Sequence, residues 1–206
     1  MTKRRRRIPA QERSRERLSR ILDAAAHEFA DQGVEAATIE AIAKRAGTSV
    51  GSIYQFYPNK RSLFEAVGDK YLDEVRALFA LLVSADALAT STEWRQIISA
   101  TIDTFAELHR TSVTFRAIWA NLHYSRRFFD AGQALNRELA DRAEIVFKTL
   151  AKDMPAARRK LLATVVIEAI SALLLLAADR PRAQGTALLD EAKMLVHRYL
   201  EPYLDG

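Results

Sequence analysis

The segment from Gly33 to Lys60 constrains the fold more than any other stretch, because its pattern indicates two short helices joined by a tight turn. Thr38 is placed to cap the first helix, since a threonine hydroxyl can accept a hydrogen bond from the free amides of a first turn. Apolar residues then recur at helical spacing, at Ile39, Ile42, Ala43 and Ala46. Gly47 follows and suits the left-handed conformation that ends a helix. We therefore predict a helical pair here, with the second helix running from Val50 to about Gln55.

The second helix of this pair presents an unusual outward face. Its outward positions are small, uncharged and hydrogen-bonding: Thr48, Ser49, Gly51, Ser52, Tyr54 and Gln55. Small residues allow a helix to enter a major groove, where Ser, Thr and Gln side chains can meet base edges or phosphates. In helix-turn-helix proteins the second helix reads DNA in this way. The periodicity alone fits an αα-hairpin that only packs equally well, so both interpretations stay open at this point.

The residues of this segment closely resemble the DNA-binding segment of the TetR family of bacterial transcriptional regulators. The family pattern is G-x4-T-x3-IA-x2-AG-[VT]-S-x-G-x-[IL]-Y-x-[HYF]-F-x2-K-x2-L. The chain matches it at Gly33, Thr38, Ile42, Ala43, Ala46, Gly47, Thr48, Ser49, Gly51, Ile53, Tyr54, Lys60 and Leu63. It departs at Phe56, where His or Tyr is more frequent, and at Tyr57, where Phe is usual. The resemblance is specific from about Leu18 to Ala66, and beyond that only helix number and length are similar.

The resemblance implies an all-α fold of about nine helices, in which an N-terminal three-helix helix-turn-helix head precedes a C-terminal helical ligand-binding and dimerisation domain. Composition agrees, because 7 Gly and 5 Pro among 206 residues leave few helix breakers. We predict a basic arm over residues 1–10, a DNA-binding domain over 11–60, and a ligand-binding and dimerisation domain over 61–206. The residues expected to contact double-stranded DNA are Thr38, Thr48, Ser49, Gly51, Ser52, Tyr54, Gln55, Tyr57 and Lys60, with Arg5 and Arg6 of the arm.

Positive charge is concentrated at the N-terminus, although the whole chain carries a net charge of only +5. The first twenty residues contain Lys3, Arg4, Arg5, Arg6, Arg7, Arg13, Arg15, Arg17 and Arg20 against Glu12 and Glu16. This distribution indicates a polyanionic partner at that end. We expect the arm to lie on phosphates or in the minor groove, the alternative being a solubilising tail. No apolar signal-peptide core follows, and cysteine is absent, so a cytoplasmic location is expected.

The C-terminal part contains three long helical patterns. A helix from Lys60 to about Ser84 is long enough to leave the head, which makes it a candidate lever. The segment Leu161–Ala178 is apolar almost all round, but we reject a membrane span because Glu168 would lie near the middle of the bilayer. We expect this helix and the last one, about Thr186–Leu204, to be buried against their own domain and a partner. Two such helices from each of two chains would form a four-helix homodimer interface.

The function predicted from these features is a ligand-responsive transcriptional regulator, in the form of a repressor released from an inverted-repeat operator by a small molecule. The alternatives are a helical adaptor without DNA binding and a small all-helical enzyme. Catalysis is disfavoured because the chain has no Gly-rich phosphate loop, no paired metal-ligating histidines and no serine nucleophile motif. No metal or cofactor is predicted. The effector is expected to be partly apolar, with its site drawn from Trp94, Phe105, Phe115, Trp119, Phe128 and Glu168, although core packing explains most of these aromatics equally well.

Overall fold

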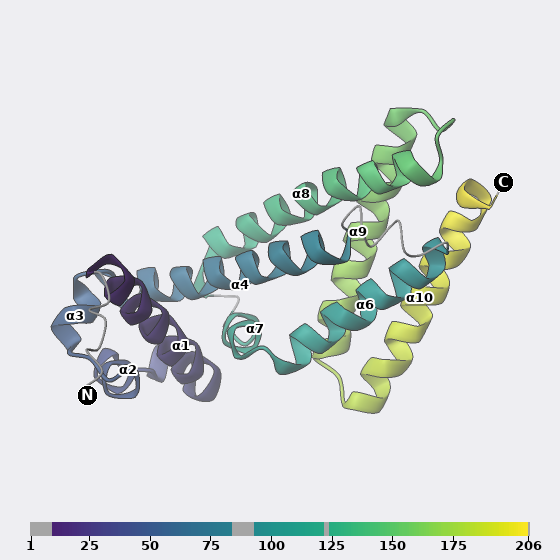
Figure 1. Ribbon diagram of the computed structural model, residues 1–206. Helices are drawn as coiled ribbons and strands as arrows, with labels where there is room; N and C mark the ends of the chain where they lie inside the picture. Colours follow the sequence, from purple (N-terminus) through teal and green to yellow (C-terminus); the bar gives the residue numbers. More distant parts are fainter. Residues whose placement is uncertain (1–9, 84–92, 122–123, 206) are drawn as a thin grey trace, which may run out of the picture. The chain divides into compact units, whose positions relative to one another are not determined.

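The computed structural model describes residues 10–83, 93–121 and 124–205, and in those residues the secondary structure is helical, with no strand. The predicted all-α fold is thus confirmed. The helices are α1 (Ala10–Ala36), α2 (Ile39–Ala46), α3 (Val50–Tyr54), α4 (Lys60–Leu82), α6 (Trp94–Thr111), α7 (Val113–Trp119), α8 (Arg126–Leu150), α9 (Ala156–Ala178) and α10 (Arg182–Leu204) (Figure 1). Pro155 and Pro181 stand immediately before α9 and α10, where the absent amide of proline costs no helical hydrogen bond.

The chain packs into two compact units that alternate along the sequence. The first unit, which we call the head, comprises residues up to Tyr71 together with Val113–Phe128, and the second comprises Leu72–Ser112 and Phe129–Gly206. Helix α4 contributes residues to both units, whereas α7 belongs to the head although it follows α6 of the second unit. The predicted boundaries at residues 10 and 60 divide the chain by function and stay a prediction.

The core of the head is built by α1, α2, α3, the first half of α4, and α7. The largest completely buried side chains come from four of these helices, namely Phe29, Ile42, Ile53 and Phe64. Ala117 and Ile118 of α7 are 0% and 2% exposed in the same cluster. Burying apolar side chains of this size contributes roughly 1.5–3 kcal/mol each. Helix α7 is therefore an integral part of the head's core.

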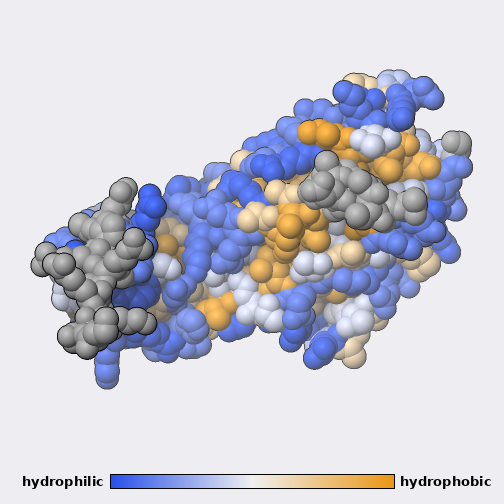
Figure 2. Space-filling view, in the orientation of Figure 1, coloured by the Kyte–Doolittle hydropathy of each residue, from blue (hydrophilic) through white to orange (hydrophobic). Residues whose placement is uncertain are grey.

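The second unit is organised around α6, α9 and α10, which pack against one another. Glycine permits the closest of these contacts, because a Cβ on Gly185 of α10 would lie 2.7 Å from the carbonyl oxygen of Ala177 on α9. Phe79 of α4 packs against Phe105 of α6, with ring centroids 6.4 Å apart. Figure 2 shows apolar residues at the surface of this unit, over α4, α6 and α8.

Helix α9 combines a buried face with an exposed apolar one. By length and composition it is the one helix in the described residues that could cross a membrane, but core helices pass the same test, and a third (33%) of that window is buried within the protein. Leu161, Val165 and Leu176 are 50%, 39% and 41% exposed on α9. Met194 and Leu195 of α10 are 38% and 53% exposed. The helix pair thus retains uncovered apolar surface in the single chain.

Candidate functional site

The helix pair α2–α3 is shaped by local hydrogen bonds that its sequence encodes. The Thr38 hydroxyl accepts from Ala41 N at 3.1 Å and caps α2. Gly47 ends that helix in the left-handed region, at φ 61°, where only glycine fits without strain. The Ser49 hydroxyl accepts from Ser52 N at 3.1 Å and caps α3. The predicted caps at Thr38 and Gly47 are confirmed.

Helix α3 turns most of its predicted contact residues outward. Ser49, Gly51, Tyr54 and Gln55 are exposed, while Thr48 and Ser52 are half-buried. Ile53 is completely buried and holds the helix on the core. The hydroxyls of Ser49 and Ser52 lie 2.9 Å apart and form a hydrogen bond. Since these two hydroxyls are engaged with each other, Tyr54 and Gln55 carry the polar groups that are most available to a partner, and Gly51 allows its close approach.

Lys60 already has a structural partner in the head. Its ammonium donates to the carbonyl oxygens of Glu35 at 2.7 Å and Ala37 at 2.9 Å. An ammonium group has three donors, so one remains for the predicted phosphate contact, which stays a prediction. Tyr57 is half-buried beside the core, and this burial raises the pKa of its hydroxyl, so the ring remains neutral.

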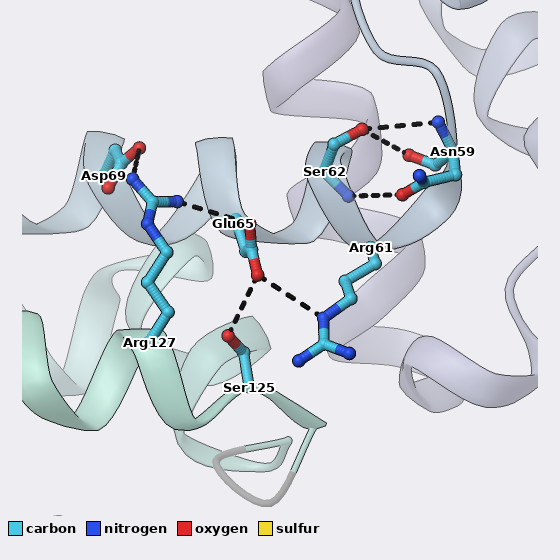
Figure 3. A network of polar contacts seen from close by, with 7 residues as sticks. All are labelled: Asn59, Arg61, Ser62, Glu65, Asp69, Ser125 and Arg127. Atoms are coloured by element: carbon cyan, nitrogen blue, oxygen red, sulfur yellow. Dashed lines mark hydrogen bonds and ion pairs between the residues drawn. The ribbon is translucent and has the colours of Figure 1, made fainter.

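Helix α4 is fixed at its start by a reciprocal cap and further along by an ion-pair network (Figure 3). Ser62 N donates to Asn59 Oδ1 at 2.8 Å, so Asn59 caps this helix. Glu65 accepts from Arg61, Arg127 and the buried Ser125 hydroxyl, the last at 3.2 Å. Arg127 also reaches Asp69 at 3.3 Å. These contacts join α4 to the start of α8 within the head.

The cations of the head fall into paired and unpaired groups. Arg45 is held by the buried Glu28 at 2.9 Å, and Lys70 by Asp23 at 2.5 Å. Within the part of the chain that the structure describes, four arginines of α1 and one lysine of α2 form no ion pair: Arg13, Arg15, Arg17, Arg20 and Lys44. The Arg20 guanidinium lies near the α2–α3 turn, 4.0 Å from where a Cβ on Gly47 would stand. The predicted contacts Arg5 and Arg6 lie outside the described residues.

Asn121, which sequence reasoning did not single out, joins the turn that ends α7 to a break in α1. Gly33 interrupts α1 with φ 79° and ψ 159°. The Asn121 side chain is 5% exposed, and its Oδ1 accepts from Val34 N at 2.9 Å. Its Nδ2 donates to Phe29 O at 3.3 Å and to Ala117 O at 2.8 Å. A glycine inside a long helical segment indicates the break, but nothing in the sequence indicates which side chain hydrogen-bonds to the backbone there.

The second unit contains an apolar cavity of about 70 Å³. Of the described residues that line it, only Thr101 and Trp94 bring polar side-chain groups, and these donate to Ile97 O at 2.7 Å and Asp205 at 2.8 Å. The full lining is Phe79, Val83, Trp94, Ile97, Ile98, Thr101, Ala143, Val146, Phe147, Leu150, Val166, Ile167, Ile170 and Leu204. Such walls favour an apolar molecule, because a polar one would lose its hydration without gaining partners.

The predicted ligand residues divide between the two units. Trp94 lines the cavity, and Phe105 is buried beside Phe79, a cavity residue. Phe115, Trp119 and Phe128 belong instead to the head; the first two stack at 6.1 Å, and Tyr71 lies against Phe115 and Phe128. These three therefore belong to a different compact unit from the cavity.

Glu168, the predicted polar anchor, does not line the cavity. Its carboxylate accepts from Asn136 of α8 at 2.9 Å, and Asn136 in turn accepts from the Ser171 hydroxyl at 3.2 Å. Its neighbours Val166, Ile167 and Ile170 line the cavity from the other side of α9. The structure thus supplies a protein partner for Glu168 and leaves its predicted role as a ligand anchor without support from the cavity.

Because His109 on α6 is buried, we expect acid to lower the free energy of unfolding. Burial lowers the pKa of His109 to about 4, against the opposing effect of a backbone hydrogen bond with Leu174. Between pH 6.5 and 4 the unfolded chain therefore binds a proton that the folded chain does not, so stability falls as pH falls through that range and is level above it. Between pH 7 and 4.5 the free energy of unfolding should fall by about 1–3 kcal/mol less in His109→Leu than in the unmodified protein. Urea unfolding at each pH measures this difference. A variant at the exposed His27, His27→Gln, is the control, and an unchanged pH dependence in His109→Leu would contradict the assignment.

Two family models match the chain, one in its N-terminal part and one in its C-terminal part. Residues 21–67 match the model of the bacterial regulatory proteins of the tetR family, and residues 92–204 match that of the tetracyclin repressor-like C-terminal domain. The HTH-type transcriptional activator FasR of Mycolicibacterium smegmatis is 31% identical over 180 residues, which are 84% of this chain and 78% of that protein.

Solved structures show the same fold. A TetR-family regulator from Streptomyces coelicolor is 25% identical with a TM-score of 0.62, covering 91% of this chain and 99% of that one. The SmeT–triclosan complex is 23% identical with a TM-score of 0.66 and covers 91% of each chain. Members of the family bind DNA operators, dimerise and bind small-molecule effectors. The chain therefore belongs to the TetR family of bacterial transcriptional regulators, and is a ligand-responsive DNA-binding transcription factor rather than an enzyme.

Proposed function

We propose that the protein is a cytoplasmic homodimeric repressor that reads an inverted-repeat operator with α3 and is released when an apolar molecule enters the cavity of the second unit. The observation that carries this proposal is an uncharged, outward-facing α3 in one unit and a predominantly apolar cavity in the other. Repression is the proposed direction, although FasR of M. smegmatis is named as an activator. A reporter driven by the bound promoter separates the two, because deleting a repressor raises expression and deleting an activator lowers it.

The proposed division of labour in the head separates base reading from phosphate binding. Gln55 is exposed at the end of α3, and the proposed reading set joins it with Thr48, Ser49 and Ser52, while Gly51 allows close approach. Thr38, Tyr54, Tyr57, Lys60 and the arm arginines Arg5 and Arg6 are proposed to hold the DNA backbone. The unpaired arginines of α1 add to that second set, and Arg20 beside the α2–α3 turn is its best-placed member. Lys60 is a poor probe of this role, since removing it also frees two carbonyl oxygens.

Gln55→Ala and Arg20→Ala should affect DNA binding in different ways. Loss of a glutamine that meets a base should relax preference at one base pair in each half-site by about 1–3 kcal/mol, with an unchanged salt dependence. Loss of a phosphate contact should weaken binding to all duplexes alike and lower the salt slope by about one unit for each arginine removed. Binding of both variants to a panel of singly substituted duplexes, selected first by the unmodified protein, measures the two effects. An unaltered base preference in Gln55→Ala would remove that residue from the reading set.

The cavity is small for an effector in the present state. Sites for drug-sized ligands usually enclose roughly 300–1,000 Å³, against about 70 Å³ here. An effector that binds must therefore favour a state in which α4, α6, α8 and α9 enclose more space. A ligand shifts such an equilibrium only by its preference for one state. Because α4 starts in the head at Lys60 and its Phe79 lines the cavity, its placement is the proposed route from effector to DNA.

Uncharged apolar compounds should raise the melting temperature, whereas charged ones should not. A panel that includes triclosan, the molecule named with the SmeT structure, suits the screen, since saturation at about 100 times Kd stabilises a protein by roughly 2.7 kcal/mol. Ile98→Trp fills the cavity wall and should abolish the shift while leaving DNA binding intact. Leu81→Trp, at a position 70% exposed, is the matched control. Stabilisation by charged compounds that survives Ile98→Trp would place the effector elsewhere.

A further inference from the structure

The connector between α1 and α2 is held by side chains from two other elements. It runs from the Gly33 break through Val34–Ala37 to the α2 cap at Thr38. Asn121 binds the backbone on both sides of the break, at Val34 N and Phe29 O. Lys60 binds the far end of the connector, at Glu35 O and Ala37 O. These two residues, together with the buried Val34 and Ala37 of the connector itself, therefore fix the direction in which the chain enters α2 and, with it, α3.

We propose that Asn121 is a positioning residue for DNA recognition, which sets the placement of α2 and α3 by fixing the break in α1. Only a carboxamide suits the site, since it must accept from one backbone amide and donate to two carbonyl oxygens. Aspartate retains the acceptor and loses the donors, and leucine loses both. The proposal rests on the proposed use of α3 as the reading helix.

Specific and non-specific DNA affinity together test the positioning role. Non-specific affinity depends on phosphate contacts and is insensitive to small changes in helix placement, whereas operator affinity requires α3 to fit the groove. We expect Asn121→Leu and Asn121→Asp to lower the ratio of operator affinity to random-duplex affinity at least tenfold. Affinity for a random-sequence duplex of the same length at low salt should be unchanged per folded molecule. The operator is the duplex that the unmodified protein selects from a random library, and the folded fraction is measured by thermal melting at the assay temperature.

Two matched variants separate positioning from a loss of stability. Ser125→Ala removes the hydrogen bond from the buried Ser125 to Glu65 in the same segment of the head without touching the connector, and should leave the affinity ratio unchanged. Gly33→Ala strains the break from its other side, because the residue has φ 79°, and should lower the ratio as the Asn121 variants do. It also gives a second test if Asn121→Leu does not fold.

The outcomes distinguish this inference from the proposed function on which it rests. If Gln55→Ala changes base preference while the Asn121 and Gly33 variants keep the full affinity ratio, Asn121 only stabilises the head and the inference is overturned. If Gln55→Ala and Ser52→Ala both leave base preference intact, the assignment of α3 as the reading helix fails instead. A ratio that falls equally in Ser125→Ala also overturns the inference, since general loosening of the head then explains the effect.

Discussion

The double substitution Leu176→Arg and Leu195→Arg is expected to convert the protein into a folded monomer that no longer binds its operator specifically. The two leucines are 41% and 53% exposed on α9 and α10 of a single chain, so arginine fits there without disturbing the core. Across a two-fold interface the same substitutions would bury like charges without partners, which costs several kcal/mol. Binding to an inverted repeat needs two linked heads. Light scattering at micromolar concentration measures the mass, and titration of the operator duplex measures the affinity.

A control at Leu81 distinguishes the α9–α10 face from apolar surface in general. Leu81 is 70% exposed on α4, and Leu81→Arg should leave the mass and the operator affinity of a dimer unchanged. If the doubly substituted protein keeps the dimer mass, association uses another surface. A monomer mass for the unmodified protein would remove the proposed dimer altogether.

The second large effect is expected from Gly185→Ala, which should destabilise the protein by about 3 kcal/mol or more. A Cβ at this position would lie 2.7 Å from the carbonyl oxygen of Ala177, so the two helix backbones must move apart. Overpacking in a core typically costs about 1–3 kcal/mol, and the cost rises when backbone rather than a side-chain end obstructs. Urea unfolding gives the free energy, and the mass shows whether the dimer is lost with the α9–α10 packing.

Gly132 provides the matched control for this substitution. It lies inside α8 of the same unit, and a Cβ there would meet no atom within 4 Å. Gly132→Ala should therefore stabilise the protein by up to about 1 kcal/mol, because alanine has the higher helix propensity. Similar unfolding free energies for the two alanine variants would show that the contact at Gly185 relaxes without cost.

Local features of the head were predictable because short-range rules determine them. Thr38 and Gly47 act within a turn of where they stand, so residue type and spacing were sufficient to predict them. Lys60 was expected to contact DNA, whereas its carbonyl partners Glu35 and Ala37 depend on how α4 meets the end of α1. Periodicity marks the apolar face of each helix but does not identify the helix that covers it.

Because periodicity does not identify the covering helix, only some of the residues predicted to bind the ligand lie at the cavity. Trp94 lies in the cavity wall, whereas Phe115 and Trp119 of α7, which packs against α1, and Phe128 at the start of α8 belong to the head. Their aromatic character indicated burial and carried no information about the unit. Glu168 stood out in an apolar helix, yet its partner Asn136 lies 32 residues earlier and shows no pattern that marks it.

The packing of residues 113–128 against the N-terminal helices determines how the DNA-binding unit can be transferred to another ligand-binding domain. A chimera that transfers only residues up to Tyr71 onto a foreign sensor would leave Phe29 and Gly33 without Ala117, Ile118 and Asn121. The transferable unit is discontinuous, so its second piece must travel with the first. The segments of the DNA-binding unit and of the ligand-binding unit thus alternate along one chain. An exchange at a single crossover would therefore join parts that were never selected to pack together.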